Sequence, residues 1–112
     1  MAYSEFLADR VNQRLASQLH LEIKKMMGGL VFMVNDKMCV GVDIDKKTGK
    51  DRLMVRVGKL PYEDLLNYKG SREMDFTGKV MRGFLFIDPE GFDLDEDLDF
   101  WIEKALEFNK LL

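Results

Sequence analysis

The chain has 112 residues, a formal net charge of -3 and a pI near 5.2, with 46% hydrophobic and 33% charged residues. This composition is typical of a folded protein and not of a disordered one, so we expect a single domain over residues 1–112. The acidic balance argues against a protein held to nucleic acid by phosphate neutralisation. Cys39 is the only cysteine, which excludes an internal disulfide, and no apolar run is long enough to cross a bilayer. We expect a cytoplasmic protein.

A helix is predicted near the N-terminus. Ser4 is a suitable N-cap because its hydroxyl can accept a hydrogen bond from a free amide of the first turn. Apolar side chains then recur at helical spacing at Phe6, Leu7, Val11, Leu15 and Leu19. The spacing predicts a first helix that extends to Leu19.

The period of the apolar residues changes to two after Gly28 and Gly29. Residues 30–34 and 37–43 read as strands, and Asn35-Asp36 between them tolerates the left-handed conformation of a two-residue hairpin turn. A polar loop over 45–51 then leads to a third strand over 52–57. These segments predict a three-stranded meander.

The second half of the chain begins with a short predicted helix. Pro61 suits the first turn of a helix over 61–67, which Gly70 ends. Strands are then expected over 72–76 and 83–88, around a turn at Thr77-Gly78. They would form a second strand pair.

A last helix is predicted at the C-terminus. Asp93 and Glu96 form an acidic variant of the capping box that starts it. Its apolar stripe consists of Leu94, Leu98, Trp101, Ile102, Ala105 and Leu106. The whole chain thus predicts an α+β, two-layer fold in the order α-β-β-β-α-β-β-α, with helices packed on an antiparallel sheet of about five strands.

Both faces of the predicted sheet carry many apolar side chains. The helix-covered face is expected to hold Leu30, Phe32, Val34, Met38, Val40, Val42, Leu53, Val55, Val57, Phe84 and Phe86. The opposite face is expected to hold Val31, Met33, Cys39, Met54, Leu85 and Ile87, with Arg52 and Arg56 among them. An exposed apolar patch of this kind marks an interaction surface, which we place at Val31, Met33, Met54, Arg56 and Leu85. The alternative is that the terminal helices cover both faces.

The sequence resembles the TfoX N-terminal domain family, which is related to the competence regulators TfoX and Sxy. The resemblance rests on MAYSEFLADRV, KKMMGGLVFMVNDKMCVGVD, DRLMVRVG, MDFTGKVMRGFLFIDPEG and DLDFWIEKALEF, and covers almost the whole chain. It implies the same two-layer α+β fold without catalytic machinery. Members of the family that act as coactivators of competence genes carry a further helical domain, so the printed chain resembles a stand-alone relative. It departs from the family pattern at Met27, commonly Phe, and at Val80, commonly Pro.

The glycine pair could bind phosphate, but a strand follows it, whereas phosphate loops lead into a helix. We therefore interpret Gly28 and Gly29 as structural, providing positive φ or close backbone approach. Two further glycines are given structural roles in the DFTG-x-x-M-x-GF stretch, Gly78 and Gly83.

No metal, cofactor or catalytic site is expected. The acidic run over 88–99 lacks the glycine and the final glutamate of a calcium loop, so its carboxylates are interpreted as stabilising a helix N-terminus. His20 and Cys39 are too isolated for a zinc site or a catalytic triad. The methionines over 26–38 lack Cys or His partners and are interpreted as core residues, not copper ligands. We expect a protein that is not an enzyme.

Arg56 is the one basic residue singled out on the sheet, because a fixed guanidinium favours a carboxylate or phosphate. Arg72, Lys79 and Arg82 could join it in an anion-binding site if the second strand pair lies beside it. The leading prediction is nevertheless a protein-interaction module, whose partner is another protein or a second copy in a homodimer. The family resemblance alone implies a regulatory role in transcription. The small-molecule or anion-binding domain is the alternative.

Overall fold

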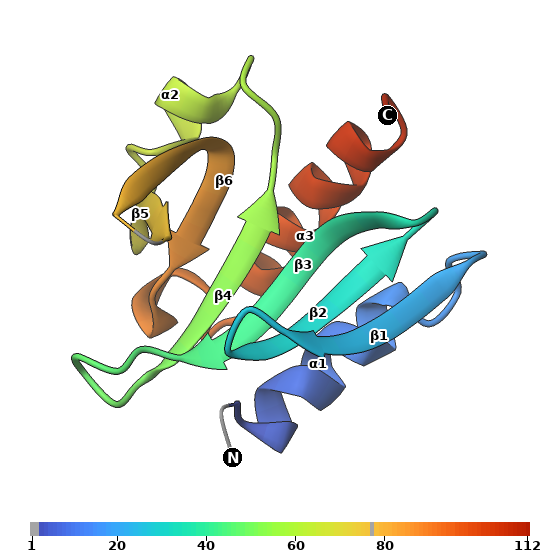
Figure 1. The fold of residues 1–112 in the computed structure, drawn as a ribbon, viewed down its shortest axis with the longest axis horizontal. Coiled ribbons are helices and arrows are strands. Elements are labelled where there is room, and N and C mark those ends of the chain that lie inside the picture. The colour runs from blue at the N-terminus through green and yellow to red at the C-terminus, as the bar shows by residue number, and fades with distance from the viewer. Residues whose placement is uncertain (1–2, 77) are drawn as a thin grey trace.

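The computed structural model describes residues 3–76 and 78–112 (Figure 1). Its elements in chain order are α1 Glu5–Leu15, β1 Leu21–Met26, β2 Gly29–Val34, β3 Lys37–Ile44, β4 Asp51–Arg56, α2 Tyr62–Leu65, β5 Ser71–Phe76, β6 Lys79–Ile87, a 3₁₀ turn η1 Pro89–Gly91 and α3 Asp95–Asn109. The predicted α+β class and the order of its elements are confirmed, except that the described residues form six strands instead of about five.

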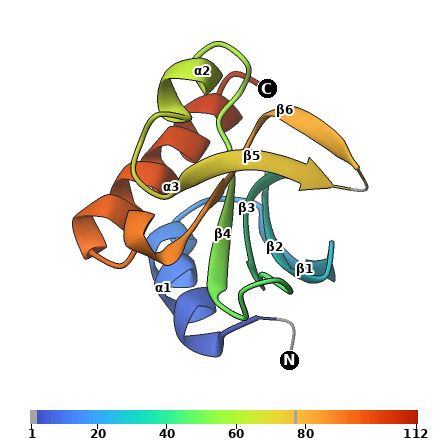
Figure 2. The same ribbon diagram turned by 90° about the vertical axis from the view of Figure 1, so that its left-hand side faces the viewer.

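The six strands form one antiparallel sheet in the order β1-β2-β3-β4-β6-β5. Helices α1 and α3 lie against the same face of this sheet, and Figure 2 shows the opposite face without a helix on it. The alternative that helices cover both faces is therefore wrong. We call the face without helices the open face.

The additional strand is β1, which the apolar pattern did not reveal. Three of the six residues Leu21–Met26 are charged, and all but Leu21 are exposed. The first helix also ends earlier than predicted, because it stops at Leu15 and Leu19 lies 79% exposed in the following turn. His20 has a φ of 59°, which no helix continues through, and β1 starts directly after it.

Two tight turns join the first three strands. Asn35 and Asp36 both have positive φ, 54° and 64°, as predicted for the turn between β2 and β3. Met27 and Gly28, with φ of 56° and 76°, repeat this geometry between β1 and β2. Turns with two left-handed residues match the twist of paired strands, so each produces a hairpin with defined register.

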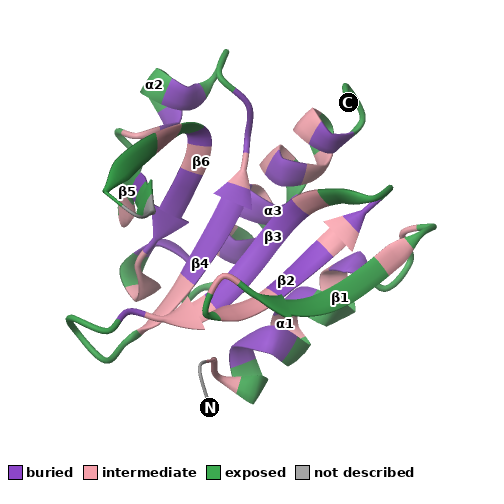
Figure 3. Cartoon of the chain, in the orientation of Figure 1, coloured by how far each residue is buried: buried purple, intermediate pink, exposed green. Residues whose placement is uncertain are grey.

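The main core lies between the helices and the sheet (Figure 3). Its largest side chain is Trp101 of α3, whose indole Nε1 donates a hydrogen bond to the Gly91 carbonyl oxygen over 3.1 Å. From the sheet it contains Phe32, Val34, Val40, Val42, Leu53, Val55, Leu85 and Ile87. Burial of one face of each strand therefore accounts for the alternation of apolar residues in β2 to β4.

Two predicted helix boundaries are wrong. α3 begins at Asp95 after an N-cap at Leu94, and no side-chain capping bond forms, so the capping box of Asp93 and Glu96 is absent. Its acidic first turn instead faces α1, where Arg10 and Arg14 both form ion pairs with Asp95. The short helix α2 covers only Tyr62–Leu65 of the predicted 61–67.

Candidate functional site

The open face carries a second apolar cluster, separate from the main core. Met54, Met74 and Phe86 are its buried members, with exposed fractions of 6%, 2% and 7%. Partly buried Met27, Met81 and Phe84 pack against them. Since none of the described helices lies on this face, other parts of the chain must exclude water from these side chains.

Side chains from the two hairpins at the edges of the sheet, β1–β2 and β5–β6, cover this cluster. Met27 lies in the turn between β1 and β2, and Met74 lies on the edge strand β5. The register of β5 against β6 shifts between Glu73 and Asp75, a β-bulge that includes Met74. Both hairpins thus contribute a thioether side chain to the cluster over β4.

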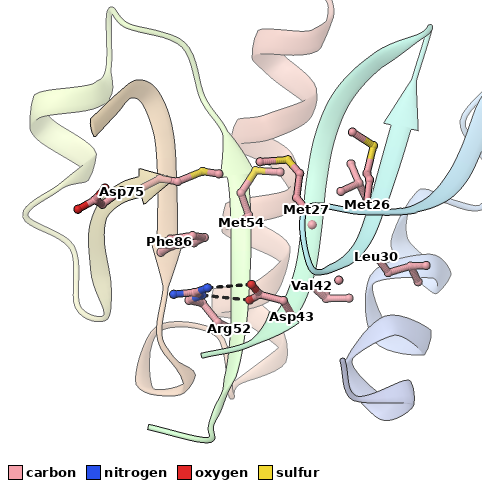
Figure 4. Close-up of a pocket in the computed structure, with 13 residues that line it drawn as sticks. Met26, Met27, Leu30, Val42, Asp43, Arg52, Met54, Asp75 and Phe86 are labelled. Carbon is pink, nitrogen blue, oxygen red and sulfur yellow. Dashed lines mark hydrogen bonds and ion pairs between the residues drawn. The ribbon is translucent and has the colours of Figure 1, made fainter. Parts of the chain in front are cut away.

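A pocket of about 70 Å³ remains between the two hairpins (Figure 4). Its lining comes from β1 to β6 and is mostly apolar, with four methionines: Met26, Met27, Met54 and Met74. Gly41 makes room for it, because an added Cβ there would lie 3.1 Å from the Met54 Cε. Pockets for small molecules usually measure about 300 to 1,000 Å³. The volume here suits one inserted side chain.

A fixed charge pair forms one rim of the pocket. Asp43 and Arg52 face each other across β3 and β4, and the guanidinium donates from Nε and Nη2 to the two carboxylate oxygens over 3.0 and 2.8 Å. The same guanidinium lies over the Phe86 ring, 3.7 Å from its centroid. Arg52 thus forms a bidentate ion pair with Asp43 and a cation–π contact with Phe86. The two contacts together fix the position of the guanidinium.

The charge pair extends into a network behind the pocket. Asp45 is 7% exposed and lies 3.7 Å from Arg52 Nη1 and 3.2 Å from Arg72 Nη2. Arg72 also donates from Nε and Nη2 to the Asp88 carboxylate over 2.7 and 2.8 Å. A hydrogen bond from the Lys47 amide, with help from the two guanidinium groups, lowers the pKa of Asp45 below its usual range. The Asp88 hydrogen bonds raise the pKa of Arg72.

Four of the five residues predicted for the interaction surface lie on strands with their side chains toward the open face. Val31 and Met54 are buried there, whereas Met33 and Arg56 are half-buried. The fifth, Leu85, lies in the main core on the helix-covered face. The prediction that Leu85 belongs to the interaction surface is therefore wrong.

The predicted faces of β6 are reversed in the structure. Leu85 pairs with Val55 and Ile87 with Leu53, so both share the face of the main core. Phe86 pairs with Met54 and Phe84 with Arg56, which places the two phenylalanines on the open face. Cys39 also belongs to the main core. A run of four apolar residues from Phe84 carries no alternation from which the faces could be told apart.

The four basic residues proposed for an anion site do not converge. Arg72 is held by Asp45 and Asp88, and Arg82 Nη1 lies 3.1 Å from Glu63 Oε1. Lys79 opens β6, at the opposite end of that strand from the Arg72 pairing position. The Arg56 guanidinium lies 5.2 Å from the Phe84 centroid and 5.5 Å from that of Phe108.

The glycines have geometric roles in the structure. Gly28 has a φ of 76° in the hairpin turn, and an added Cβ at Gly29 would collide with the Val42 carbonyl oxygen of the neighbouring strand. Gly78 and Gly83 also have positive φ, 80° and 93°. Gly29 therefore allows β2 to approach β3 closely, and Gly28 provides the positive φ of the turn before it.

The groups considered for catalysis or metal binding are the Cys39 thiol and the His, Cys, Asp and Glu side chains. Burial raises the pKa of the Cys39 thiol to about 12, with the Arg56 charge opposing the shift, which disfavours the reactive thiolate form at neutral pH. Within residues 3–76 and 78–112, no three His, Cys, Asp or Glu side chains gather as a metal site would require. The helices described there are all too short or too polar to cross a membrane.

Comparison with known proteins identifies the family of this chain. The sequence profile of the TfoX N-terminal domain matches residues 13–109. The chain belongs to the TfoX N-terminal domain family. No curated protein matches it. A crystal structure of a protein from Pseudomonas syringae has a TM-score of 0.61 at 13% identity, covering 87% of this chain and 93% of that one, which shows a shared fold.

Several residues of the pocket in this chain were not predicted from the sequence. Met74 and Phe86 were not assigned to it, and neither was the Asp43–Arg52 pair. One signal was present: a strand ending in Asp43 and a strand beginning near Arg52 become neighbours in any meander. Of the two departures from the family pattern, Met27 lines the pocket and Val80 lies half-exposed on β6.

Proposed function

We propose that this chain is a non-catalytic protein-interaction module that binds a partner through the pocket on its open face. The observation that carries the proposal is the methionine-lined pocket between the two hairpins, with the Asp43–Arg52 pair fixed at its rim. The TfoX N-terminal domain is a non-catalytic family, which is consistent with this proposal.

The size of the pocket favours a protein partner over a small molecule. A volume of about 70 Å³ is below even the roughly 150 Å³ of a cavity that holds benzene. It can take an aliphatic side chain of a partner whose remaining contacts lie outside the pocket. Methionine side chains adapt to such a guest because they are unbranched and polarizable. Ordinary interfaces combine an apolar centre of this kind with a polar rim.

The rim indicates the chemistry of the partner. Asp43 and Arg52 are paired with each other through two hydrogen bonds, and Asp75 adds an acidic side chain on the β5 side of the pocket. A basic residue, Lys24, lies on β1 at the other side, where it pairs with Val31 of the open face. We propose a partner segment with one apolar anchor residue between polar neighbours.

A regulatory role in transcription, in the cytoplasm, completes the proposal. It is supported by the family, whose known members include coactivators of competence genes. The anion-binding alternative is not favoured, because two of its four basic residues are held in ion pairs with carboxylates.

The test is a comparison of proteins captured by the wild type and by two matched variants. Met26→Glu places a charge at the pocket, where Met26 is 37% exposed, so the fold is retained. Leu94→Glu makes the same change at a 57% exposed residue before α3, on the helix side, and serves as the control. Purified tagged proteins are incubated with native cell extract, and bound proteins are quantified by mass spectrometry.

We expect at least one protein that the wild type and Leu94→Glu retain equally and Met26→Glu loses. A photo-crosslinking residue at position 26 should then attach to that same protein, and its identity decides whether the role is transcriptional. Identical capture by the two variants would overturn binding at the pocket.

A further inference from the structure

We infer that two copies of this chain pair along the outer edges of their β1 strands, which would give one continuous antiparallel sheet across a two-fold axis. The inference concerns the outer edge of β1, where Met26 is the one β1 residue that also lines the pocket, and it does not rest on the proposed function. Figure 1 shows β1 as the outermost strand on one side. Its six residues pair with β2 without a register shift, so the edge is regular.

The edge is accessible along its length. Residues 22–26 are all exposed, which Figure 3 shows as a green strand. Two of them are large apolar side chains, Ile23 at 46% and Met26 at 37% exposure. An exposed, regular edge with apolar side chains is a template for another strand unless its charges prevent pairing.

The hydrogen bonds inside the hairpin decide which backbone groups face outward. The Asn35 amide donates to the His20 carbonyl oxygen over 3.3 Å, so the His20–Asn35 pair is of the hydrogen-bonded type. Opposite residues of an antiparallel ladder alternate between hydrogen-bonded and non-bonded pairs. Glu22 and Lys24 therefore bond inward to β2, whereas the backbone groups of Leu21, Ile23 and Lys25 point to the free edge.

An antiparallel pair of β1 strands can use these groups only when odd-numbered residues oppose one another. If Ile23 lies on the two-fold axis, it opposes Ile23 of the partner subunit, and Leu21 opposes Lys25 of the partner subunit. Glu22 then stands directly across from Lys24 of the partner subunit, and the symmetry repeats this pair. Directly opposed charges of opposite sign stabilise a strand pair.

The neighbouring registers have the reverse effect. If the two-fold axis passes through residue 22 instead, Glu22 opposes Glu22 of the partner subunit. If it passes through residue 24, Lys24 opposes Lys24 of the partner subunit. Like charges directly opposed destabilise a strand pair. The charges on β1 thus disfavour unspecific edge pairing and favour one register, in which the exposed Ile23 side chains meet on the helix side of the sheet.

The other edge of the sheet does not offer the same arrangement. Strand β5 is interrupted by the bulge between Glu73 and Asp75, which breaks the regular spacing of its outward groups. A bulge of this kind is a common means of protecting an edge. The second copy is therefore assigned to β1.

Charge reversal tests this register by measurement of mass in solution. Sedimentation velocity is recorded over a concentration series for the wild type, Glu22→Lys, Lys24→Glu and the double variant Glu22→Lys/Lys24→Glu. The intrachain Glu22–Lys24 contact of 3.8 Å joins two exposed side chains, so its loss does not affect folding. Glu73→Lys on β5 is the control with an equal charge change.

We expect a concentration-dependent dimer for the wild type and for Glu73→Lys. Each single variant replaces two attractive pairs by two repulsive ones, which should weaken the dimer by about tenfold or more. The double variant restores opposite charges in the same register and should recover the dimer.

Hydrogen exchange locates the contact independently. The amides of Leu21, Ile23 and Lys25 should become protected as the protein concentration rises, whereas those in β5 should not change. A wild type that remains monomeric at millimolar concentration would overturn the inference. A dimer that survives both single charge reversals would equally exclude this edge.

Discussion

The guanidinium of Arg52 lies over the ring of Phe86, with its central carbon 3.7 Å from the ring centroid. It keeps this position because its Nε and Nη2 donors are both held by Asp43. Phe86 is only 7% exposed although no helix covers its face of the sheet. The charge pair therefore acts as a cover for an aromatic side chain, and it forms the rim of the pocket at the same time.

Replacement of Arg52 by lysine tests this dual contact. Lys keeps the positive charge but loses the paired hydrogen bonds and the planar stacking, so Arg52→Lys should lower the free energy of unfolding by about 1 to 2 kcal/mol. Urea denaturation gives the value. The control is Arg82→Lys, whose ion pair joins side chains 69% and 72% exposed and should contribute almost nothing. Equal effects of the two substitutions would contradict the role given to Arg52.

Asp45 makes stability depend on pH at the acidic end. Because its pKa is lowered in the folded state, its stabilising contribution is complete above the unfolded value of 3.8 and is lost as pH falls from there through the folded pKa. Asp45→Asn keeps an oxygen for the Lys47 amide but removes the charge facing Arg52 and Arg72. It should cost about 1 to 3 kcal/mol at pH 7.

The check is a series of urea denaturation curves for both proteins from pH 7 to pH 2.5. The difference between wild type and Asp45→Asn should be constant down to about pH 4 and then shrink, in line with the lowered pKa of Asp45. A difference that does not change with pH would show that the ion pairs contribute nothing.

How far the sequence predicted these features depended on how local they are. The turn at Asn35-Asp36 was predictable because its residue types alone permit positive φ. Strand β1 was not, because an edge strand buries little and its charged residues hide the alternation. The faces of β6 were reversed because Phe84–Ile87 are all apolar. The Asp43–Arg52 contact depends on the register between two strands, which only the folded sheet defines.

The glycine pair between β1 and β2 should respond to substitution in two different ways. An alanine at Gly29 would place its Cβ against the Val42 carbonyl oxygen and 2.7 Å from the Asp43 Cβ, so Gly29→Ala forces two strands apart. At Gly28 nothing lies within 4 Å, and the cost comes only from the φ of 76°. Gly28→Ala should then cost about 1 to 2 kcal/mol and Gly28→Asn less, because asparagine tolerates this conformation.

Thermal unfolding followed by circular dichroism ranks these variants. We expect Gly28→Asn above Gly28→Ala, and Gly29→Ala lowest or unable to fold. A Gly29→Ala protein as stable as Gly28→Ala would contradict the close approach of β2 and β3.

Asn109 joins the end of α3 to the hairpin of β2 and β3. It is 5% exposed, its Nδ2 donates to the Val34 carbonyl oxygen over 3.0 Å, and its Oδ1 accepts from Asn35 Nδ2 over 3.2 Å. Asn109→Ala leaves the Val34 carbonyl without this donor in a buried place, which should lower the free energy of unfolding by about 1 to 3 kcal/mol. Asn67→Ala removes a 3.4 Å hydrogen bond to the Glu63 carbonyl oxygen at an exposed residue and should change stability by less than about 0.5 kcal/mol.

Urea denaturation of both variants measures the change in global stability, and hydrogen exchange at the β2–β3 turn measures local loosening. If Asn109→Ala unfolds at the wild-type urea concentration, the helix is held to the sheet by apolar contacts alone.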